Sequence, residues 1–156
     1  MKIDIGISQT KLQKASKLLS TVLADEVMLY TKTRKFHWNV SGNSFMELHL
    51  LFEGQYNELE VIIDEVAERI NQLGQKSIGT MKEFLDHSNL KETPGENPAQ
   101  KDMVNELLHD HETVIKNIRK SIAECEEMDD AGTTDFLTSV MMKHEKTAWI
   151  LRRYLS

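Results

Sequence analysis

Five residues in the first half of the chain combine imidazole and carboxylate groups in a pattern suited to metal binding. They are His37, His49, Glu53, Asp64 and Glu68. Imidazole nitrogens together with carboxylate oxygens suit divalent iron, zinc or manganese, and no thiolate stands near them in the sequence. The residue types therefore predict a metal site, with iron favoured among the three metals.

Four of these residues lie on one face of a helix predicted over residues 44–73. At about 100° per residue, with His49 at zero, Glu53 falls near 40°, Asp64 near 60° and Glu68 near 100°. Their heights differ, because His49 and Asp64 are about 22 Å apart along a helix that rises about 1.5 Å per residue. One copy of this helix therefore cannot bring His49 and Asp64 to the same metal ion.

Two antiparallel copies of the helix, related by a two-fold axis, solve this problem. In such a pair, the numbers of two residues that lie at the same height, one from each copy, add up to a constant. The sum is nearly the same for His49 with Asp64, His49 with Glu68, and Glu53 with Asp64. An axis near residues 57–59 therefore places each histidine beside the carboxylates of the other copy. Gly54 lies close to this axis, where its missing side chain would let the helices approach.

His37 joins the site through the turn between two helices. A turn centred near Gly42 places residue 37 level with about residue 47, so that His37 and His49 meet within one chain. A single polar residue on a helix is usually just solvated, and it is the joint geometry that favours a metal site. An intrachain ferritin-like di-iron centre is disfavoured, because it needs Glu-x-x-His on two helices and the chain has this pattern only at Glu106 to His109.

The apolar pattern predicts four long helices that position these residues. Apolar side chains recur at helical spacing over residues 8–39, 44–73 and 98–127, and from Thr133 or Thr134 almost to the last residue. Ser44 and Glu47 have the spacing of a capping box, Gly74 is a predicted stop, and residues 129–132 are expected to end the third long helix. A short helical piece is expected at residues 80–85, in the long connection that also holds both prolines. This order predicts an all-α, ferritin-like four-helix bundle with a short extra helix in its crossover, and residues 1–156 as one domain.

Composition limits the class of protein further. The chain has 156 residues, a net charge of −6 and a single cysteine, Cys125. A lone thiol without a secretion signal indicates a reducing compartment, so a cytoplasmic protein is expected. No stretch approaches the roughly 18 apolar residues of a membrane span, so no membrane partner is expected.

The densest motifs resemble those of a known family. The segment FHWNVSG at residues 36–42, the pairs Leu48-His49 and Phe52-Glu53, and DEVAERI at residues 64–70 followed by Leu73-Gly74 are similar to the Dps family, the DNA-binding proteins from starved cells or mini-ferritins. The resemblance is densest over residues 36–74. Helix order, the crossover, and Glu145, Lys146 and Trp149 extend it weakly over the rest of the chain.

The resemblance implies a hollow homo-dodecamer built from two-fold dimers, with a di-iron ferroxidase centre shared between two subunits. His37 and His49 would come from one subunit and Asp64 and Glu68 from its neighbour, with Glu53 also contributing. It further implies that Trp38 lies beside the site, that hydrogen peroxide preferentially oxidises Fe²⁺, and that Fe³⁺ is stored as a mineral. Two irons could deliver two electrons to peroxide together, which avoids the release of hydroxyl radical. The expected role is protection against oxidative stress.

Iron entry and DNA binding are the two remaining expectations from the family. Acidic pores near the junction of the last two helices would be lined here by Asp129, Asp130 and Asp135, whose charge would concentrate cations. Tail-driven DNA binding is not expected, because residues 1–10 contain only Lys2, and the basic stripe of Lys11, Lys14 and Lys17 is interpreted as a solvated face. Association with the nucleoid is left open.

Two alternatives remain beside the ferroxidase. One is a DNA-coating or structural shell protein whose metal site is silent or purely structural. The other is a helical partner-binding module without metal, which leaves the histidine and carboxylate pattern unexplained. Sequence leaves open the native metal, because Zn²⁺ would compete for the same ligands. It also leaves open the choice between peroxide and oxygen, and the assembly size apart from the resemblance.

Overall fold

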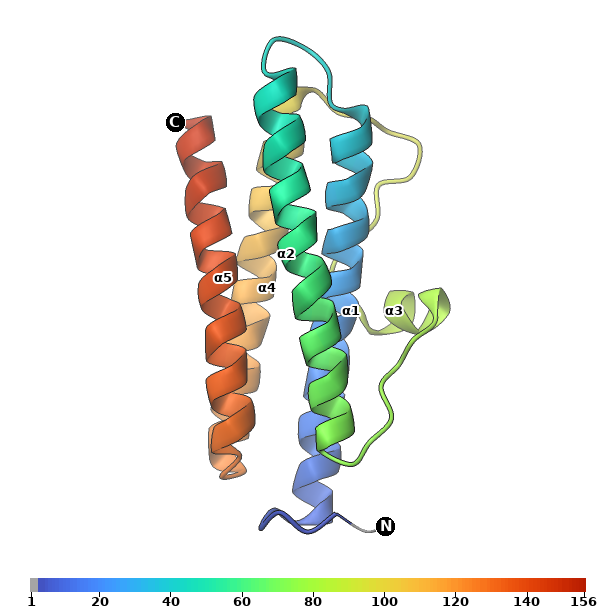
Figure 1. The fold of residues 1–156 in the computed structure, drawn as a ribbon, viewed down its shortest axis with the longest axis vertical. Coiled ribbons are helices and arrows are strands. Elements are labelled where there is room, and N and C mark those ends of the chain that lie inside the picture. The colour runs from blue at the N-terminus through green and yellow to red at the C-terminus, as the bar shows by residue number, and fades with distance from the viewer. Residues whose placement is uncertain (1–2) are drawn as a thin grey trace.

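The computed structural model describes residues 3–156, which form two antiparallel helical hairpins lying side by side (Figure 1). The first hairpin pairs α1 (Gln9–Asn39) with α2 (Phe45–Gln72), and the second pairs α4 (Gln100–Glu127) with α5 (Ala131–Leu155). The short helix α3 (Met81–His87) stands beside α1 in the long connection from α2 to α4. No strand occurs over residues 3–156. The predicted all-α ferritin-like bundle with a short crossover helix is confirmed.

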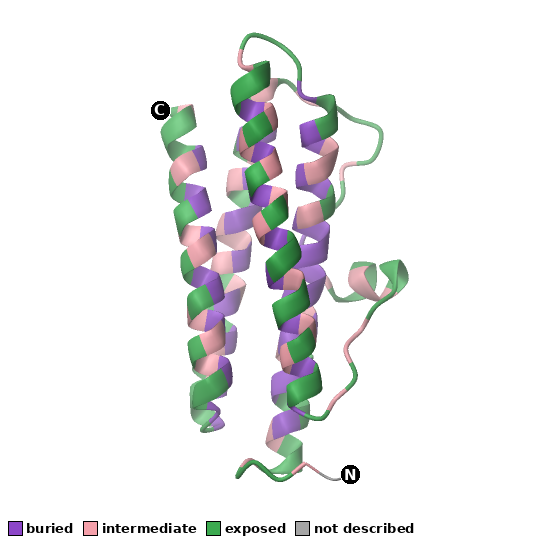
Figure 2. Ribbon diagram, in the orientation of Figure 1, coloured by how far each residue is buried: buried purple, intermediate pink, exposed green. Residues whose placement is uncertain are grey.

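The buried residues lie on the inward faces of the helices (Figure 2), and the apolar ones among them form one core. The predicted stripes are buried along α1, α4 and α5, although Tyr30, Leu108, Ile115, Ile122 and Leu155 are only partly covered. Phe36 of α1 and Phe52 of α2 are fully buried, with their ring centroids 6.4 Å apart. Cys125 is free and buried, and burial, followed by the charge of Asp130, raises the pKa of its thiol to about 11. Cys125 therefore contributes to packing, and its thiol is not reactive because little of it is in the thiolate form.

The helix ends at Ser8 and Gly74 agree with the sequence prediction, but the capping box expected at Ser44 does not form. Ser8 caps α1 with its hydroxyl, and Gly74 ends α2 with φ +76°, its N–H donating to Asn71 O and that of Gln75 to Ile70 O. The capping box predicted at Ser44 is wrong, because the Ser44 side chain makes no capping bond. Its backbone N–H points instead to Gln100 Oε1 at 3.4 Å, so the donor that Glu47 would have bound is taken by the start of α4.

The predicted start of the last helix at Thr133 or Thr134 is also wrong. Asp129, with φ +60°, turns the chain after α4, and Asp130 then caps α5. The Asp130 carboxylate accepts the Thr133 N–H at 3.0 Å and the Thr133 hydroxyl at 2.6 Å. Gly132 therefore lies inside α5 rather than ending a helix.

Asp130 also ties the two hairpins together. Arg69 of α2 approaches its Oδ1 at 3.3 Å and donates to the Thr133 hydroxyl through Nε and Nη2, at 3.1 and 3.0 Å. Asp130 is only 2% exposed. A buried carboxylate with charged and neutral donors on two elements fixes how α5 sits against α2.

A layer of buried polar side chains crosses the bundle, with one residue from each long helix. They are Glu26, Gln55, His111 and His144. His144 Nε2 bonds to Glu26 Oε1 at 2.8 Å, and its Nδ1 lies 2.9 Å from Nδ1 of His111. The amide of Gln55 and Nε2 of His111 have no partner within residues 3–156, and both residues line a cavity of about 10 Å³, room for about one water.

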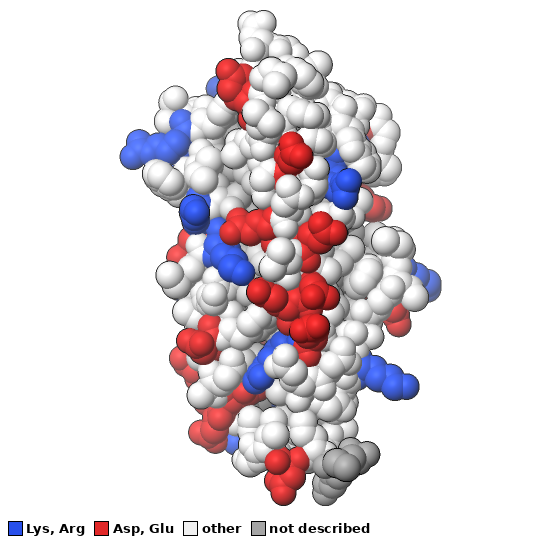
Figure 3. All heavy atoms as spheres, viewed as in Figure 1, with Lys and Arg blue, Asp and Glu red and all other residues white. Residues whose placement is uncertain are grey.

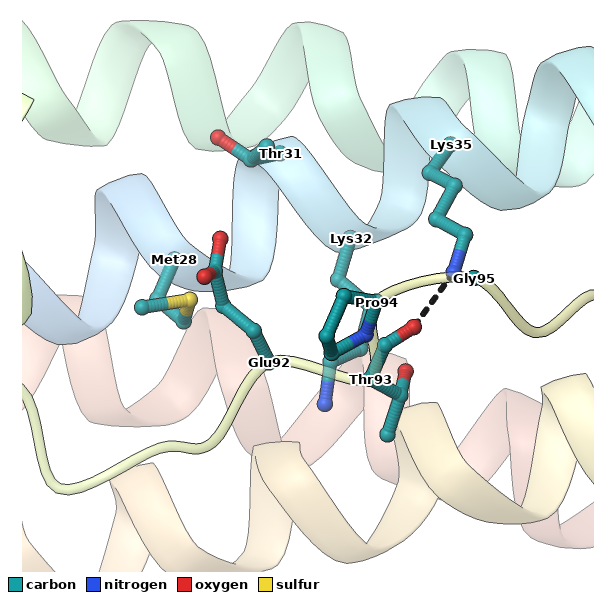
Figure 4. A pocket seen from close by; sticks show the side chains of 8 residues that line it. All are labelled: Met28, Thr31, Lys32, Lys35, Glu92, Thr93, Pro94 and Gly95. Atoms are coloured by element: carbon teal, nitrogen blue, oxygen red, sulfur yellow. Dashed lines mark hydrogen bonds between the residues drawn. The ribbon is translucent and has the colours of Figure 1, made fainter.

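The crossover is held against α1 by polar contacts around an open pocket of about 260 Å³ (Figure 4). Lys35 Nζ donates to the Thr93 carbonyl at 2.7 Å. Beneath the same pocket, the buried Lys32 binds Asp110 at 2.6 Å and Glu106 at 2.9 Å, which joins α1 to α4.

Within the described part of the chain, no helix is long and apolar enough to cross a membrane.

Replacing Asp130 tests the cap and its link to Arg69. Asp130→Ala should lower the free energy of unfolding by about 2 kcal/mol, since it removes a buried cap and leaves donors of Arg69 and Thr133 unpaired. Thermal unfolding at fixed protein concentration measures this. The matched control is Asp129→Asn, which keeps a residue tolerant of positive φ and removes only an exposed ion pair with Lys11. Equal stability of the two variants would contradict the assignment.

Replacing His111 tests the buried polar layer. Burial, and then the charge of His144, hold the pKa of His111 well below its ordinary value of 6.5. Below about pH 6.5 the unfolded chain binds a proton at His111, whereas the folded chain does not. The free energy of unfolding is therefore unaffected by protonation of this residue above that pH and falls as the pH is lowered below it. The loss approaches about 1.4 kcal/mol per pH unit for one proton.

His111→Gln should therefore show a shallower fall in the free energy of unfolding between about pH 7 and pH 5 than the unaltered chain. Denaturant unfolding across that range provides the measurement. His87→Gln, at an exposed histidine on α3, is the control and should keep the unaltered slope. If His111→Gln kept that slope as well, the buried layer would not govern the pH dependence.

Candidate metal centre

The turn between α1 and α2 brings His37 and His49 together. α1 ends at Asn39, and Gly42 adopts φ +113°, a conformation that favours glycine. Packing of Phe36 on Phe52 fixes the hairpin directly beneath. The two imidazole rings stack with centroids 3.8 Å apart and planes 19° from parallel.

Each histidine is held by the backbone of the opposite helix. His37 Nδ1 donates to the carbonyl of His49 at 2.8 Å, and His49 Nδ1 donates to the carbonyl of His37 at 2.9 Å. A carbonyl oxygen only accepts, so both rings carry their hydrogen on Nδ1. In each neutral ring Nε2 then keeps its lone pair, which is the arrangement found in metal-ligating histidines. The pair is preorganised to offer two nitrogen ligands from rings that are nearly parallel.

The carboxylates are placed differently from the histidines. Glu53 is half-buried one turn after His49, whereas Asp64 and Glu68 are exposed farther along α2. Over residues 3–156, none of the three forms an ion pair or a side-chain hydrogen bond, and no three His, Cys, Asp or Glu side chains converge as a metal-holding group. Within the described residues, the chain thus brings His37 and His49 together, leaves Asp64 and Glu68 apart from them, and engages none of the three carboxylates in an ion pair or side-chain hydrogen bond.

The face of α2 that carries these carboxylates is acidic and partly apolar. The helix has seven acidic side chains against one basic, Arg69, and Figure 3 shows acidic groups gathered down the middle of the face to which α2 contributes. Met46, Leu50 and Val61 are 58%, 57% and 54% exposed on this helix. A Cβ added at Gly54 would meet nothing within 4 Å, so nothing within the described chain explains its lack of a side chain.

Aromatic groups and one cation flank the histidines. Phe45 lies 5.1 Å from the His49 ring, and Tyr56 meets the His37 ring edge-on at 5.2 Å. Arg34 lies over the Tyr56 ring and also approaches Trp38, which is 66% exposed. Arg34 and Tyr56 are not among the site residues predicted from the sequence. Helical spacing could have found them, since Tyr56 falls within about 20° of His49 and Arg34 precedes Trp38 by one turn.

The three aspartates expected at a pore differ in their surroundings. Asp130 is buried as the cap of α5, so its carboxylate is already bound. Asp129 is exposed and pairs with Lys11 at 2.8 Å, and Asp135 is exposed on α5. Lys14 pairs with Glu124 at 2.9 Å, so two of the three lysines in the basic stripe on α1 have acidic partners. Lys2, the one basic residue counted in the N-terminal tail, lies outside the described residues.

Known proteins are similar to this chain in sequence and in fold. The family described as Ferritin-like domain matches residues 16–156. An uncharacterized low temperature-induced protein of Nostoc sp. is 42% identical over 99% of this chain and 87% of its own length. The DNA protection during starvation protein 2 of Bacillus anthracis is 37% identical over 90% of this chain and 95% of its own length. The crystal structure of the Dps protein of Vibrio cholerae O1, described as a member of a broad superfamily of ferritin-like diiron-carboxylate proteins, superposes with a TM-score of 0.94 at 29% identity, covering 100% of this chain and 98% of that one.

Proposed function

Because this chain belongs to the Dps family of ferritin-like proteins, we propose that it oxidises Fe²⁺ and stores Fe³⁺ at centres shared between two subunits. The observation that carries this proposal is the reciprocal bonding of His37 and His49, which leaves both Nε2 lone pairs free. Nitrogen ligands of this kind, next to unpaired carboxylates, suit Fe²⁺. Zn²⁺ would compete for the same groups.

The remaining ligands are proposed to come from a second copy. Asp64 and Glu68 share the face of α2 with His49 but lie too far along the helix for one chain to use both. An antiparallel pair of α2 helices places Asp64 and Glu68 of the partner subunit beside His37 and His49, with Glu53 contributing from the histidine side. The same pairing would cover the exposed Met46, Leu50 and Val61 and would give Gly54 a reason to lack a side chain.

The chemistry follows from holding two Fe²⁺ ions together. Each Fe²⁺ gives one electron, and the two electrons break the O–O bond of hydrogen peroxide, so that two Fe²⁺ and one H₂O₂ yield two Fe³⁺ and two hydroxide ions. A single Fe²⁺ supplies only one electron and would release hydroxyl radical. The carboxylates offset the positive charge of the ions, while the locked histidines fix their positions. This pairing supports peroxide as the preferred oxidant and protection against oxidative stress as the role.

Storage requires an enclosed assembly, and we propose the dodecameric shell built from two-fold dimers that the family resemblance implied. Asp129 and Asp135 are exposed near the α4–α5 junction and are the proposed cation-attracting residues of an entry pore, while Asp130 has its structural contacts instead. DNA coating is not proposed, since Lys11 and Lys14 of the basic stripe are paired with acidic groups.

Co-assembly of two variants tests whether one site draws on two chains. His49→Ala and Asp64→Ala should each lose rapid anaerobic Fe²⁺ oxidation by added hydrogen peroxide. When both variants are co-expressed and pair at random, about half of the two-fold dimers are mixed, and each mixed dimer holds one intact site of two. Ferric absorbance should therefore recover to about a quarter of the unaltered rate.

The matched control co-expresses His37→Ala with His49→Ala. Both histidines belong to the same half of the site, so no combination of these two chains rebuilds it and no recovery is expected. A site contained within one chain would show no recovery in either mixture. That result would reject the shared centre, and full activity in both single variants would reject the ligand assignment altogether.

Replacing Gly54 tests the close approach of two α2 helices. In one chain a side chain here meets open space, and leaving glycine in a helix costs roughly 1 kcal/mol relative to alanine. Gly54→Leu should therefore keep its helical circular dichroism but lose particle mass by light scattering, together with iron oxidation. Gly79→Leu, at a glycine equally open to substitution but away from α2, should assemble normally. Normal assembly of Gly54→Leu would contradict the proposed pairing.

A further inference from the structure

Arg34 holds an unusual position behind the histidine pair. Its guanidinium carbon lies 4.6 Å from the ring centre of Tyr56 and 5.4 Å from those of Tyr30 and Trp38. It donates one hydrogen bond, from Nη1 to the Tyr30 hydroxyl, and its buried Nε has no partner among residues 3–156. Arg34 forms no ion pair in that part of the chain. Stacking on aromatic rings, rather than charge pairing, therefore fixes its position.

Tyr56 connects this cation to the metal centre. Its ring stands nearly perpendicular to the His37 ring, at 78° and 5.2 Å, and nearly perpendicular to Tyr30, at 88° and 6.2 Å. The order of contacts runs from Arg34 to Tyr56, then to His37 and His49. Over residues 3–156, Arg34 makes hydrogen-bond and cation–π contacts with Tyr30, Tyr56 and Trp38 but none with the histidines, so the structure connects it to them through Tyr56.

The His37 ring needs support from this side. The bond from its Nδ1 to the His49 carbonyl fixes one atom, but a hydrogen bond tolerates a range of angles, and a tilt of the ring about Nδ1 changes the direction of the Nε2 lone pair. His49 covers one side of the ring, and Tyr56 meets it from another. Tyr56 is itself only half-buried, so its ring orientation depends on the groups packed against it, and Arg34 lies over that ring.

We propose that Arg34 is a positioning residue of the metal centre, whose planar guanidinium holds Tyr56 against His37 and thereby directs the lone pair of His37 Nε2. This inference rests on the proposed function, because it assigns a ligand role to His37. The proposal requires more of residue 34 than a contribution to the stability of the α1–α2 hairpin. A flat, delocalised cation is required at this position, and the compact ammonium of lysine does not replace it.

Anaerobic titration of the assembled protein with Co²⁺ tests the proposal, because the visible absorption of bound Co²⁺ reports the geometry of its ligands as well as its affinity. Arg34→Met keeps an apolar side chain of similar length and should weaken Co²⁺ binding roughly tenfold, the effect typical of supports behind a ligand, and change the absorption bands. Arg34→Lys should not restore either property.

Coupling between the two residues gives the second measurement. Tyr56→Leu should match Arg34→Met, and the double variant should bind Co²⁺ no more weakly than either single one, because both changes remove the same support. Additive losses, unchanged spectra in Arg34→Met, or full rescue by Arg34→Lys would each overturn the proposal. Thermal unfolding of every variant identifies those that fail to fold, and Arg34→Lys is the conservative substitution from which the conclusion is drawn if Arg34→Met is among them.

His49→Ala separates this inference from the function on which it rests. If the unaltered protein binds Co²⁺ and His49→Ala does not, the proposed metal centre is supported. The role of Arg34 is then decided by the Co²⁺ titrations of the Arg34 variants. If the unaltered protein and His49→Ala bind Co²⁺ equally, the proposed centre is wrong and the positioning role is rejected with it.

Discussion

The register of α1 against α2 is the constraint on which the proposed metal centre depends. Each histidine side chain bonds to the backbone carbonyl of the other histidine, so the two bonds form together only at one register of the hairpin. A slip of one residue would turn a side chain by about 100° around its helix and break both bonds. Packing of Phe36 on Phe52, the turn at Gly42 and the contact from Ser44 to Gln100 all maintain this register from different sides. The arrangement of His37 and His49 therefore follows from the way in which the α1–α2 hairpin closes.

The interior of the bundle explains why the proposed centre lies at its surface. Ferritin-like di-iron sites use carboxylates and Glu-x-x-His pairs that project inward from four helices. Here the inward positions hold Glu26, Gln55, His111 and His144, and the ring of His144 already bonds to both Glu26 and His111. These contacts hold the buried polar groups against one another and leave a cavity of about 10 Å³. The carboxylates without partners are instead on the outward face of α2, where a second chain can reach them.

Sequence was sufficient where the determinants are local and insufficient where two distant segments compete. The helices, the stop at Gly74 and the meeting of His37 with His49 follow from periodicity and from one short turn. The Ser44 capping box was wrong because Gln100, 56 residues away, takes the required N–H. The start of α5 was placed too late because the hydrogen bonds of Asp130 depend on Thr133 and on Arg69 of another helix. Helical spacing places Tyr56 beside His49 and Arg34 beside Trp38, but the stacking of Arg34 on Tyr56 joins two helices, and no single stripe displays it.

The charge of α2 links assembly to cations. Seven acidic side chains and one arginine give the helix a strongly negative face, and an antiparallel pair of such faces brings like charges together. At physiological ionic strength screening acts over about 8 Å, so carboxylates that meet closely at an interface still repel. Apolar burial of Met46, Leu50 and Val61 favours the pairing, while Asp64 and Glu68 oppose it until positive charge lies between them. In the proposed dimer that charge is the substrate Fe²⁺. By linkage, a cation bound between two subunits stabilises their contact to the same extent that the contact strengthens cation binding.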